Sequence, residues 1–224
     1  MTLQTETWTH ELGRRVRTLL VLKMLANLSG IAAFFYAYFW IMRHPLSAAR
    51  VIPVIWIDDL VPFSPQSFFL YASLWVYVAL GSLFTRDGRE LAGWAAACFS
   101  MIIVGLSIFM ALPTKVPDFA VDWSQYPSLE FLKAVDASGN ALPSLHAAFA
   151  VFTGVVLHGQ LTAIRAPRAV LACNVLWCLG IVYSAMATRQ HLALDIIAGA
   201  VLAGAVSIAY VAAGRAPHTA QEES

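Results

Sequence analysis

Apolar residues in this chain are grouped in long runs that are separated by short polar stretches. A helix that crosses the hydrocarbon core of a bilayer needs about 20 predominantly apolar residues. Six runs of roughly that length are present, and we therefore predict an all-α fold: a polytopic membrane protein built as a bundle of six transmembrane helices. The expected helices cover residues 19–42, 68–84, 91–111, 145–161, 169–187 and 196–213.

The polar stretches between these runs have turn and loop chemistry. Residues 43–45 (RHP) and 165–168 (RAPR) each contain a proline, which ends or interrupts a helix. We expect one membrane domain over residues 1–224, because the six apolar runs follow one another closely. Its predicted parts outside the bundle are an N-terminal segment at 1–18, a loop at 112–144 and a tail at 214–224.

The overall composition agrees with a chain that has lipid as its main solvent. Of its 224 residues, 59% are hydrophobic and only 12% are charged, and the mean hydropathy is +0.69. A net charge of +1 provides no basic footprint for nucleic acid. The three cysteines all lie inside apolar runs, where we interpret them as small core residues.

Lys and Arg residues are unequally divided between the two sides of the predicted bundle. Cytoplasmic loops of membrane proteins carry the excess of these residues. With nine on one side and five on the other, we expect both termini in the cytoplasm and the 112–144 loop on the extracytoplasmic face. The nine are Arg14, Arg15, Arg17, Lys23, Arg86, Arg89, Arg165, Arg168 and Arg215, and the five are Arg43, Arg50, Lys115, Lys133 and Arg189.

Two short segments on the predicted outer side carry residues suited to catalysis. Ser144 and His146 open the fourth helix, near unpaired backbone N–H groups and the positive end of the helix dipole. His191 and Asp195 are four residues apart where the sixth helix begins, a spacing that places both on one helical face. The carboxylate can then hold one imidazole nitrogen while the other stays basic.

Two cations complete this predicted group. Lys115 follows the third helix, and Arg189 precedes His191 by two residues. A carboxylate-backed histidine, a second histidine, a hydroxyl and two cations provide the nucleophile, acid and oxygen donors that phosphoryl transfer through a phosphohistidine requires. The spacing indicates this chemistry.

Two motifs carry a family resemblance. PSLHAA (residues 143–148) and TRQHLALDIIAG (residues 188–199) resemble the last two signatures of the type 2 phosphatidic acid phosphatase superfamily, six-helix enzymes whose sites open at a membrane face. The more usual form of the PSLH motif is Pro-Ser-Gly-His, and Leu145 stands in place of its glycine. With leucine at this position, the chain is most similar to the inositol phosphorylceramide synthase-like branch. DDLVPFSP (residues 58–65) is also similar to that branch, so the resemblance spans roughly residues 58–199.

The resemblance implies a membrane enzyme that acts on a phospholipid or a lipid-linked phosphate. His191 would be the nucleophile, Asp195 its orienting partner and His146 the general acid. The implied acceptor is water or a lipid hydroxyl, as in the sphingolipid synthases, and no cofactor or metal is expected. Phosphate would be bound by Ser144, Lys115 and Arg189.

The chain departs from the superfamily at two cationic positions. The usual Lys is followed after six residues by Arg-Pro, whereas Lys115 is followed at that offset by Asp122-Trp123. The usual third motif has an arginine six residues before its histidine, where this chain has Ala185. Lys115 and Arg189 are therefore hypothetical substitutes for the usual cations.

Other interpretations of the same residues stay open. The two histidines and Asp195 could hold a metal, and Lys115 could merely extend from a helix end toward water. Asp58 and Asp59 are more typical of loop capping than of an acid–base pair, since adjacent residues point in different directions. A non-catalytic lipid carrier or assembly subunit with the same fold is the alternative function, and it would keep working after replacement of His191.

Overall fold

The structure is a computed structural model that describes residues 7–135 and 140–214. Its elements, in chain order, are α1 (Trp8–Arg17), α2 (Leu20–Arg43), β1 (Arg50–Val51), α3 (Trp56–Asp59), η1 (Pro65–Ser67), α4 (Phe68–Ala72), α5 (Leu74–Leu83), α6 (Gly88–Ala111), β2 (Thr114–Lys115), η2 (Trp123–Gln125), α7 (Pro127–Val135), α8 (Leu145–Ala163), α9 (Arg168–Ala187) and α10 (Ala193–Ala212). The protein is an all-α polytopic membrane protein. Within the described residues, six helical stretches are long and apolar enough to cross a membrane.

Local sequence signals explain where the long helices begin and end. The Asp87 side chain accepts a hydrogen bond from the backbone N–H of Glu90 and caps α6. Ser144 caps α8 in the same way, through the N–H of Ala147. After α10 the chain turns at Gly214, whose φ of 62° is the left-handed conformation that favours glycine after a helix.

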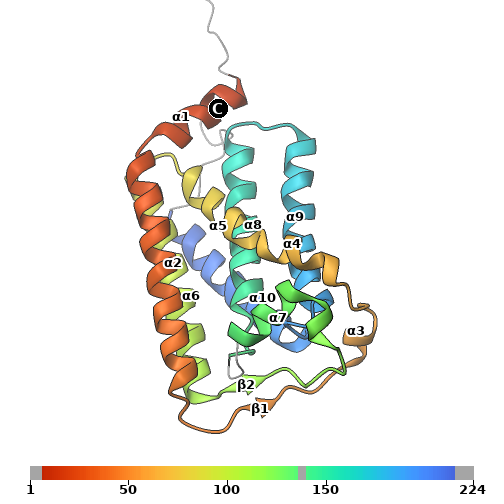
Figure 1. Ribbon diagram of the computed structural model, residues 1–224. Helices are drawn as coiled ribbons and strands as arrows, with labels where there is room; N and C mark the ends of the chain where they lie inside the picture. Colours follow the sequence, from red (N-terminus) through yellow and green to blue (C-terminus); the bar gives the residue numbers. More distant parts are fainter. Residues whose placement is uncertain (1–6, 136–139, 215–224) are drawn as a thin grey trace, which may run out of the picture.

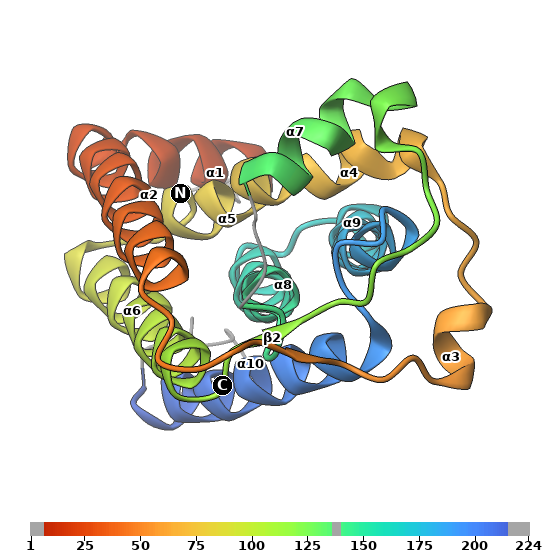
Figure 2. The same ribbon diagram turned by 60° about the horizontal axis from the view of Figure 1, so that its bottom comes forward.

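Helix α8 lies at the centre of the bundle. Figure 2 shows it surrounded by the other long helices, and its apolar window is 61% buried, against 11% for the window of α2. Its inward-facing Phe149 and Phe152 belong to a core that also includes Tyr77, Trp94 and Met101. Each of these side chains packs among helices rather than against lipid, which fixes the position of the N-terminus of α8.

The two ends of the bundle differ in what covers them, and we name them by their elements. The strand end holds β1, β2, α3, α7 and the N-termini of α8 and α10, whereas the α1 end holds α1 and the C-terminal end of α10 (Figure 1). At the strand end, β1 and β2 pair in parallel, with Arg50 opposite Thr114. The backbone of Ala141 donates to the Thr114 carbonyl, and so three segments of the strand end are joined together.

At the α1 end, a buried lysine holds three backbone segments together. The ammonium of Lys23, which is fully buried, donates to the carbonyl oxygens of Arg15, Leu83 and Thr85 at 2.7, 3.0 and 2.8 Å. Arg15 lies in α1, Leu83 is the last residue of α5, and Thr85 follows that helix. One side chain therefore attaches α1 to the bundle.

The six predicted spans agree with the observed helices to within a few residues at most ends. Features that were not anticipated include α1 within the N-terminal segment, the short β1–β2 pairing, and a break at Ser73 that divides the second span into α4 and α5. The Ser73 hydroxyl accepts from the Trp177 indole at 2.9 Å, which attaches the break to α9. The predicted tail at 214–224, including Arg215, lies outside the described residues apart from Gly214.

Candidate active site

His191 and Asp195 are in contact at the start of α10, although not as two residues of one helix. The helix begins at Ala193, so His191 lies in the turn before it. The Nδ1 atom of His191 is 3.3 Å from Oδ2 of Asp195, within ion-pair reach but without hydrogen-bond geometry. The Asp195 carboxylate also accepts from the backbone N–H of Leu192, which fixes it at the helix start.

His146 faces His191 from the first turn of α8. The centroids of the two rings are 6.2 Å apart. Reacting atoms approach to about 3–3.5 Å in a productive complex, and two such approaches, one to each ring, add up to about this distance. The His146 ring stacks on Tyr71 at 3.9 Å, and its Nε2 atom has no hydrogen-bond partner among the residues that the structure describes.

A backbone contact fixes the two histidine-bearing segments relative to each other. The N–H of Ser144 donates to the carbonyl oxygen of Asp195 at 2.9 Å. Close approach is possible because residue 199 is glycine: a Cβ atom there would lie 2.2 Å from the Ser144 carbonyl oxygen. The positive ends of two helix dipoles, those of α8 and α10, therefore meet next to the histidines.

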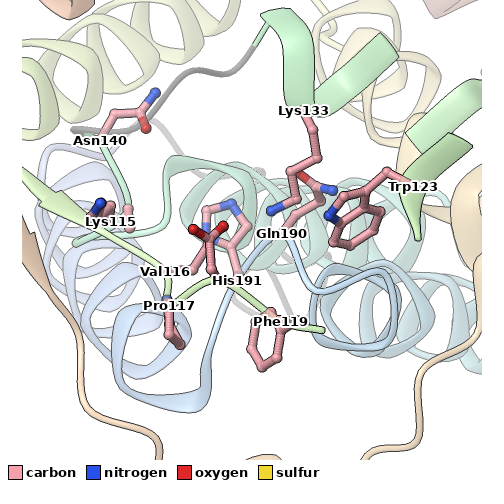
Figure 3. A pocket seen from close by; sticks show the side chains of 11 residues that line it. Lys115, Val116, Pro117, Phe119, Trp123, Lys133, Asn140, Gln190 and His191 are labelled. Carbon is pink, nitrogen blue, oxygen red and sulfur yellow. The ribbon is translucent and has the colours of Figure 1, made fainter. Parts of the chain in front are cut away.

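A polar cavity of about 370 Å³ opens on one side of His191. Figure 3 shows Lys115 from β2 and Lys133 from α7 around it, with Gln190 and His191 between them. The Lys133 ammonium donates to the carbonyl oxygen of Arg189 at 3.0 Å and lies 5.2 Å from the centroid of the Trp123 ring. Two lysines and one carboxylate, that of Asp118, thus line a cavity that also contains the proposed nucleophile, and the excess of positive charge suits an anionic group.

A second cavity, of about 130 Å³, adjoins the other side of the histidines. It is lined mostly by aromatic and apolar side chains of α2, α4, α5 and α8, among them Phe34, Tyr71 and Phe149. His191 and Asn140 line both cavities, and the Asn140 amide donates to the Tyr38 hydroxyl. His191 therefore lies where a polar cavity meets an apolar one, and His146 lines the apolar one, an arrangement that suits an amphipathic phosphate.

A comparison with known families matches residues 91–217 to the PAP2 superfamily. The chain belongs to the PAP2 superfamily. The matched region, more than half of the chain, includes Lys115, both histidines and Asp195. Members of the PAP2 superfamily are generally phosphatases or phosphotransferases, and the match indicates phosphatase-type activity on lipid phosphates.

Two further comparisons give no closer relative. Neither the curated proteins nor the solved structures contain a match to this chain. The PAP2 superfamily assignment thus leaves the resemblance to the inositol phosphorylceramide synthase-like branch untested, and that resemblance stays a prediction.

The structure shows what two side chains contact near the departures from the PAP2 superfamily motifs: Asp122, which stands where arginine is usual, and Arg189, the proposed substitute for a missing arginine. Asp122 is exposed and caps η2; hydrogen bonds from Ser124 and Gln125 hold the pKa of its carboxyl below the usual value. Arg189 has a positive φ of 57°. Its guanidinium donates to the carbonyl oxygen of Asp58 at 3.3 Å and lies over the ring of Phe119.

Two of the predicted phosphate ligands therefore have structural contacts. Arg189 is not among the residues that line the polar cavity, and Ser144 is fully buried with its hydroxyl capping α8. The roles predicted for them in phosphate binding stay predictions. Among the described residues there is no group of three His, Cys, Asp or Glu side chains that could hold a metal.

Three residues around the histidines were not identified from the sequence as part of the site: Tyr71, Lys133 and Asn140. The sequence did point to Lys133 as a possible site residue, because it is a cation in the same predicted outer loop as Lys115. Asp58 has the capping role favoured above: its carboxylate accepts from the N–H groups of Ile55 and Ala193 at 2.8 and 2.7 Å. It thereby fixes α3 to the start of α10, beside His191.

Proposed function

We propose that this protein is a membrane-embedded lipid phosphatase or phosphotransferase that uses His191 as its nucleophile. The observation that carries the proposal is the position of the two histidines. Their rings face each other across 6.2 Å, Asp195 lies behind His191, and His191 lines both the cationic and the apolar cavity. A lipid phosphate has the matching division into an anionic head group and an apolar tail.

In the first step, a nitrogen of His191 attacks the phosphorus of the substrate. With Asp195 on the Nδ1 side, Nε2 is the atom that forms the new N–P bond. The bond from phosphorus to the lipid oxygen breaks, and His146 gives a proton to that oxygen as it leaves. Asp195 stabilises the positive charge that develops on the His191 ring.

In the second step, an acceptor hydroxyl attacks the phosphohistidine. His146 takes the proton from the acceptor, the new O–P bond forms, and the N–P bond to His191 breaks. Water as the acceptor gives hydrolysis, and a lipid hydroxyl gives transfer of the head-group phosphate, as the resemblance to sphingolipid synthases implies. The two outcomes are thus alternative fates of one intermediate.

Lys115 and Lys133 are the cations that we propose for the phosphoryl oxygens, because both line the polar cavity with His191. Converging N-termini of α8 and α10 add positive potential at the same place. Ser144 and Arg189 then act mainly by fixing the segments that carry His146 and His191.

We propose that the strand end, and with it the site, faces away from the cytoplasm. This orientation is supported by the excess of Lys and Arg at the α1 end. The test is labelling of intact cells with a membrane-impermeant thiol reagent, after Cys98, Cys173 and Cys178 are replaced by Ser. A cysteine at Asp118, beside the polar cavity, should react, and one at Arg165 should not; the reverse pattern would overturn the orientation.

The decisive test of the mechanism is to trap the intermediate. Purified protein is mixed with a lipid phosphate labelled at phosphorus and quenched rapidly. We expect protein-bound label that is stable in alkali and labile in acid, present in the wild type and absent in His191→Ala. Unlabelled wild-type protein during measurable turnover, with inversion at a chiral phosphorus, would mean direct attack by the acceptor.

The same preparation distinguishes the acceptors. If water and a lipid hydroxyl compete at the second step only, adding diacylglycerol or ceramide should raise the transferred product and lower free phosphate. Normal cellular function of His191→Ala, with no turnover of any lipid phosphate by the wild type, would instead favour the non-catalytic carrier.

A further inference from the structure

A third cavity, of about 690 Å³, lies at membrane depth between α2, α5 and α6. Four small residues of α2 form one wall of this groove, at positions that recur along one face of the helix: Ala26, Gly30, Ala33 and Ala37. A Cβ atom added at Gly30 would have no neighbour within 4 Å, so there is open space above it. The facing side of the groove includes Trp94 and Phe99 of α6.

The groove adjoins the aromatic cavity beside the histidines. Phe34, Trp75 and Phe149 line both of them, and the Phe34 ring packs on the other two between the cavities. A lipid with its phosphate at His191 would reach the groove by displacing these rings. This adjacency distinguishes the groove from an isolated depression in the lipid-facing surface.

The length of the path is comparable to the thickness of one leaflet. Along α2 it extends from Tyr38 in the aromatic cavity to Ala26 in the groove, which at 1.5 Å per residue is roughly 18 Å. Half of a hydrocarbon core of about 30 Å is about 15 Å. One extended hydrocarbon chain fits this distance.

Polar groups occupy the far end of the groove. The Asn27 amide donates to the Ser82 hydroxyl at 2.6 Å, and both residues line the groove. One turn beyond Asn27 on α2 is Lys23 with its three backbone carbonyls. A methyl terminus that reached this point would displace polar contacts, because apolar carbon offers them no hydrogen bond.

We propose that this groove binds one hydrocarbon chain of the lipid phosphate, and that its polar end limits the length of the chain. The inference rests on the proposed function and deepens it, since it specifies the tail of the substrate. Specificity for chain length would then come from Gly30 and Ala33, which leave the groove open, and from Asn27, which ends it.

The test uses monoacylglycerol phosphates, because a single acyl chain leaves no doubt about which tail occupies the groove. Wild-type protein, Gly30→Phe, Ala33→Phe and Ala32→Phe are purified in one detergent. Release of phosphate is measured for chains from hexanoyl to stearoyl. Ala32 is the matched control, since it is exposed on the same helix, next to Ala33, and does not line the groove.

A phenyl ring in the groove should act on long chains only. We expect Gly30→Phe and Ala33→Phe to lower kcat/KM for the stearoyl substrate by about tenfold, as overfilling of a packed site does. The hexanoyl substrate should stay within about twofold of wild type, the range of an exposed substitution. Ala32→Phe should behave as wild type with every chain.

A second variant tests the polar end. Asn27→Ala removes the amide and should shift the preferred chain length upward by one or more steps of the series. Unchanged chain-length preference in all groove variants, with active wild-type protein, would overturn the inference and mean that ordinary bilayer lipid fills the groove. No turnover of any substrate by the wild type would instead count against the proposed function.

Discussion

Lysines at the two ends of this bundle have opposite surroundings. At the α1 end, the Lys23 ammonium is buried and donates to three backbone carbonyls from two parts of the chain. At the strand end, Lys115 and Lys133 line a cavity of about 370 Å³ together with His191. The first is surrounded by the protein's own acceptors, whereas the other two border a space that a ligand can enter, although Lys133 also donates to the Arg189 carbonyl oxygen.

We interpret this difference as one between a charge that stabilises the fold and charges that are proposed to bind substrate, in a chain where both are costly. An ionisable residue at membrane depth is a functional candidate by default. Lys23 is an exception, since its contacts account for the three donors of an ammonium. A charged side chain in a membrane protein is therefore best judged by what its polar atoms face.

The largest expected effect is that of removing the nucleophile. His191→Ala should lower kcat by about a thousandfold or more, as loss of a covalent catalyst does in other enzymes, and should leave the free energy of unfolding nearly unchanged. Asp195→Ala should keep more activity, because it orients rather than reacts. Turnover by His191→Ala within tenfold of wild type would contradict the assigned role.

Lys23→Met should have the opposite effects: a loss of stability without a loss of activity. Three backbone carbonyls lose their donor, and we expect a loss of about 3 kcal/mol in the free energy of unfolding, by analogy with other buried polar groups left unpaired. Activity per folded molecule should not change. Denaturant unfolding in detergent, paired with an activity assay at low temperature, checks both expectations. A stable but inactive variant would contradict the structural role assigned to Lys23.

Gly199→Ala tests whether the two histidine segments must approach closely. The new methyl group would lie 2.2 Å from the Ser144 carbonyl oxygen and should separate α8 from α10, at a cost of about 1–3 kcal/mol. Activity should fall together with stability. Gly204→Ala is the matched control on the same helix, where a Cβ atom meets nothing within 4 Å, and an equal effect at both glycines would refute the explanation.

Lys133→Gln should mainly weaken substrate binding. Loss of one charge-assisted contact to a phosphoryl oxygen corresponds to about a tenfold rise in KM, with a smaller change in kcat and little change in stability. Steady-state kinetics with one lipid phosphate measure both constants. An unchanged KM would leave Lys115 as the sole cation proposed for the phosphate.

The smallest effect is expected from a chelator. Cations and helix N-termini are proposed to stabilise the charge that a divalent ion stabilises in metal-dependent phosphatases, so excess EDTA should leave activity unchanged. Loss of activity that one specific metal restores would favour the metal-site interpretation of His146, His191 and Asp195.

The sequence predicted the spans well because length and apolarity are sufficient to recognise them. It could not predict α1, whose attachment depends on Lys23, a residue that appears in the sequence only as a charge at the start of an apolar run. The break at Ser73 was equally hidden, since it depends on a hydrogen bond from Trp177, more than a hundred residues away.

In the site, the contact between His191 and Asp195 followed from their spacing, although a turn rather than a helix brings them together. The meeting of His146 with His191 was expected from a shared membrane side. The stacking of Tyr71 on His146 could not be predicted, because Tyr71 belongs to α4, which is distant in sequence. Arg189 was proposed for its charge, and only the structure shows its guanidinium at the Asp58 carbonyl.

The hydrogen bond from the Ser144 N–H to the Asp195 carbonyl has a consequence for biogenesis. Helix α8 emerges from the ribosome before α10, and during that interval its first turn lacks this acceptor. The two histidines are brought together only when the last helix has inserted. If they act as proposed, a nascent chain that stops after α9 carries only His146 of the pair, and we expect it to be inactive toward the lipids around it.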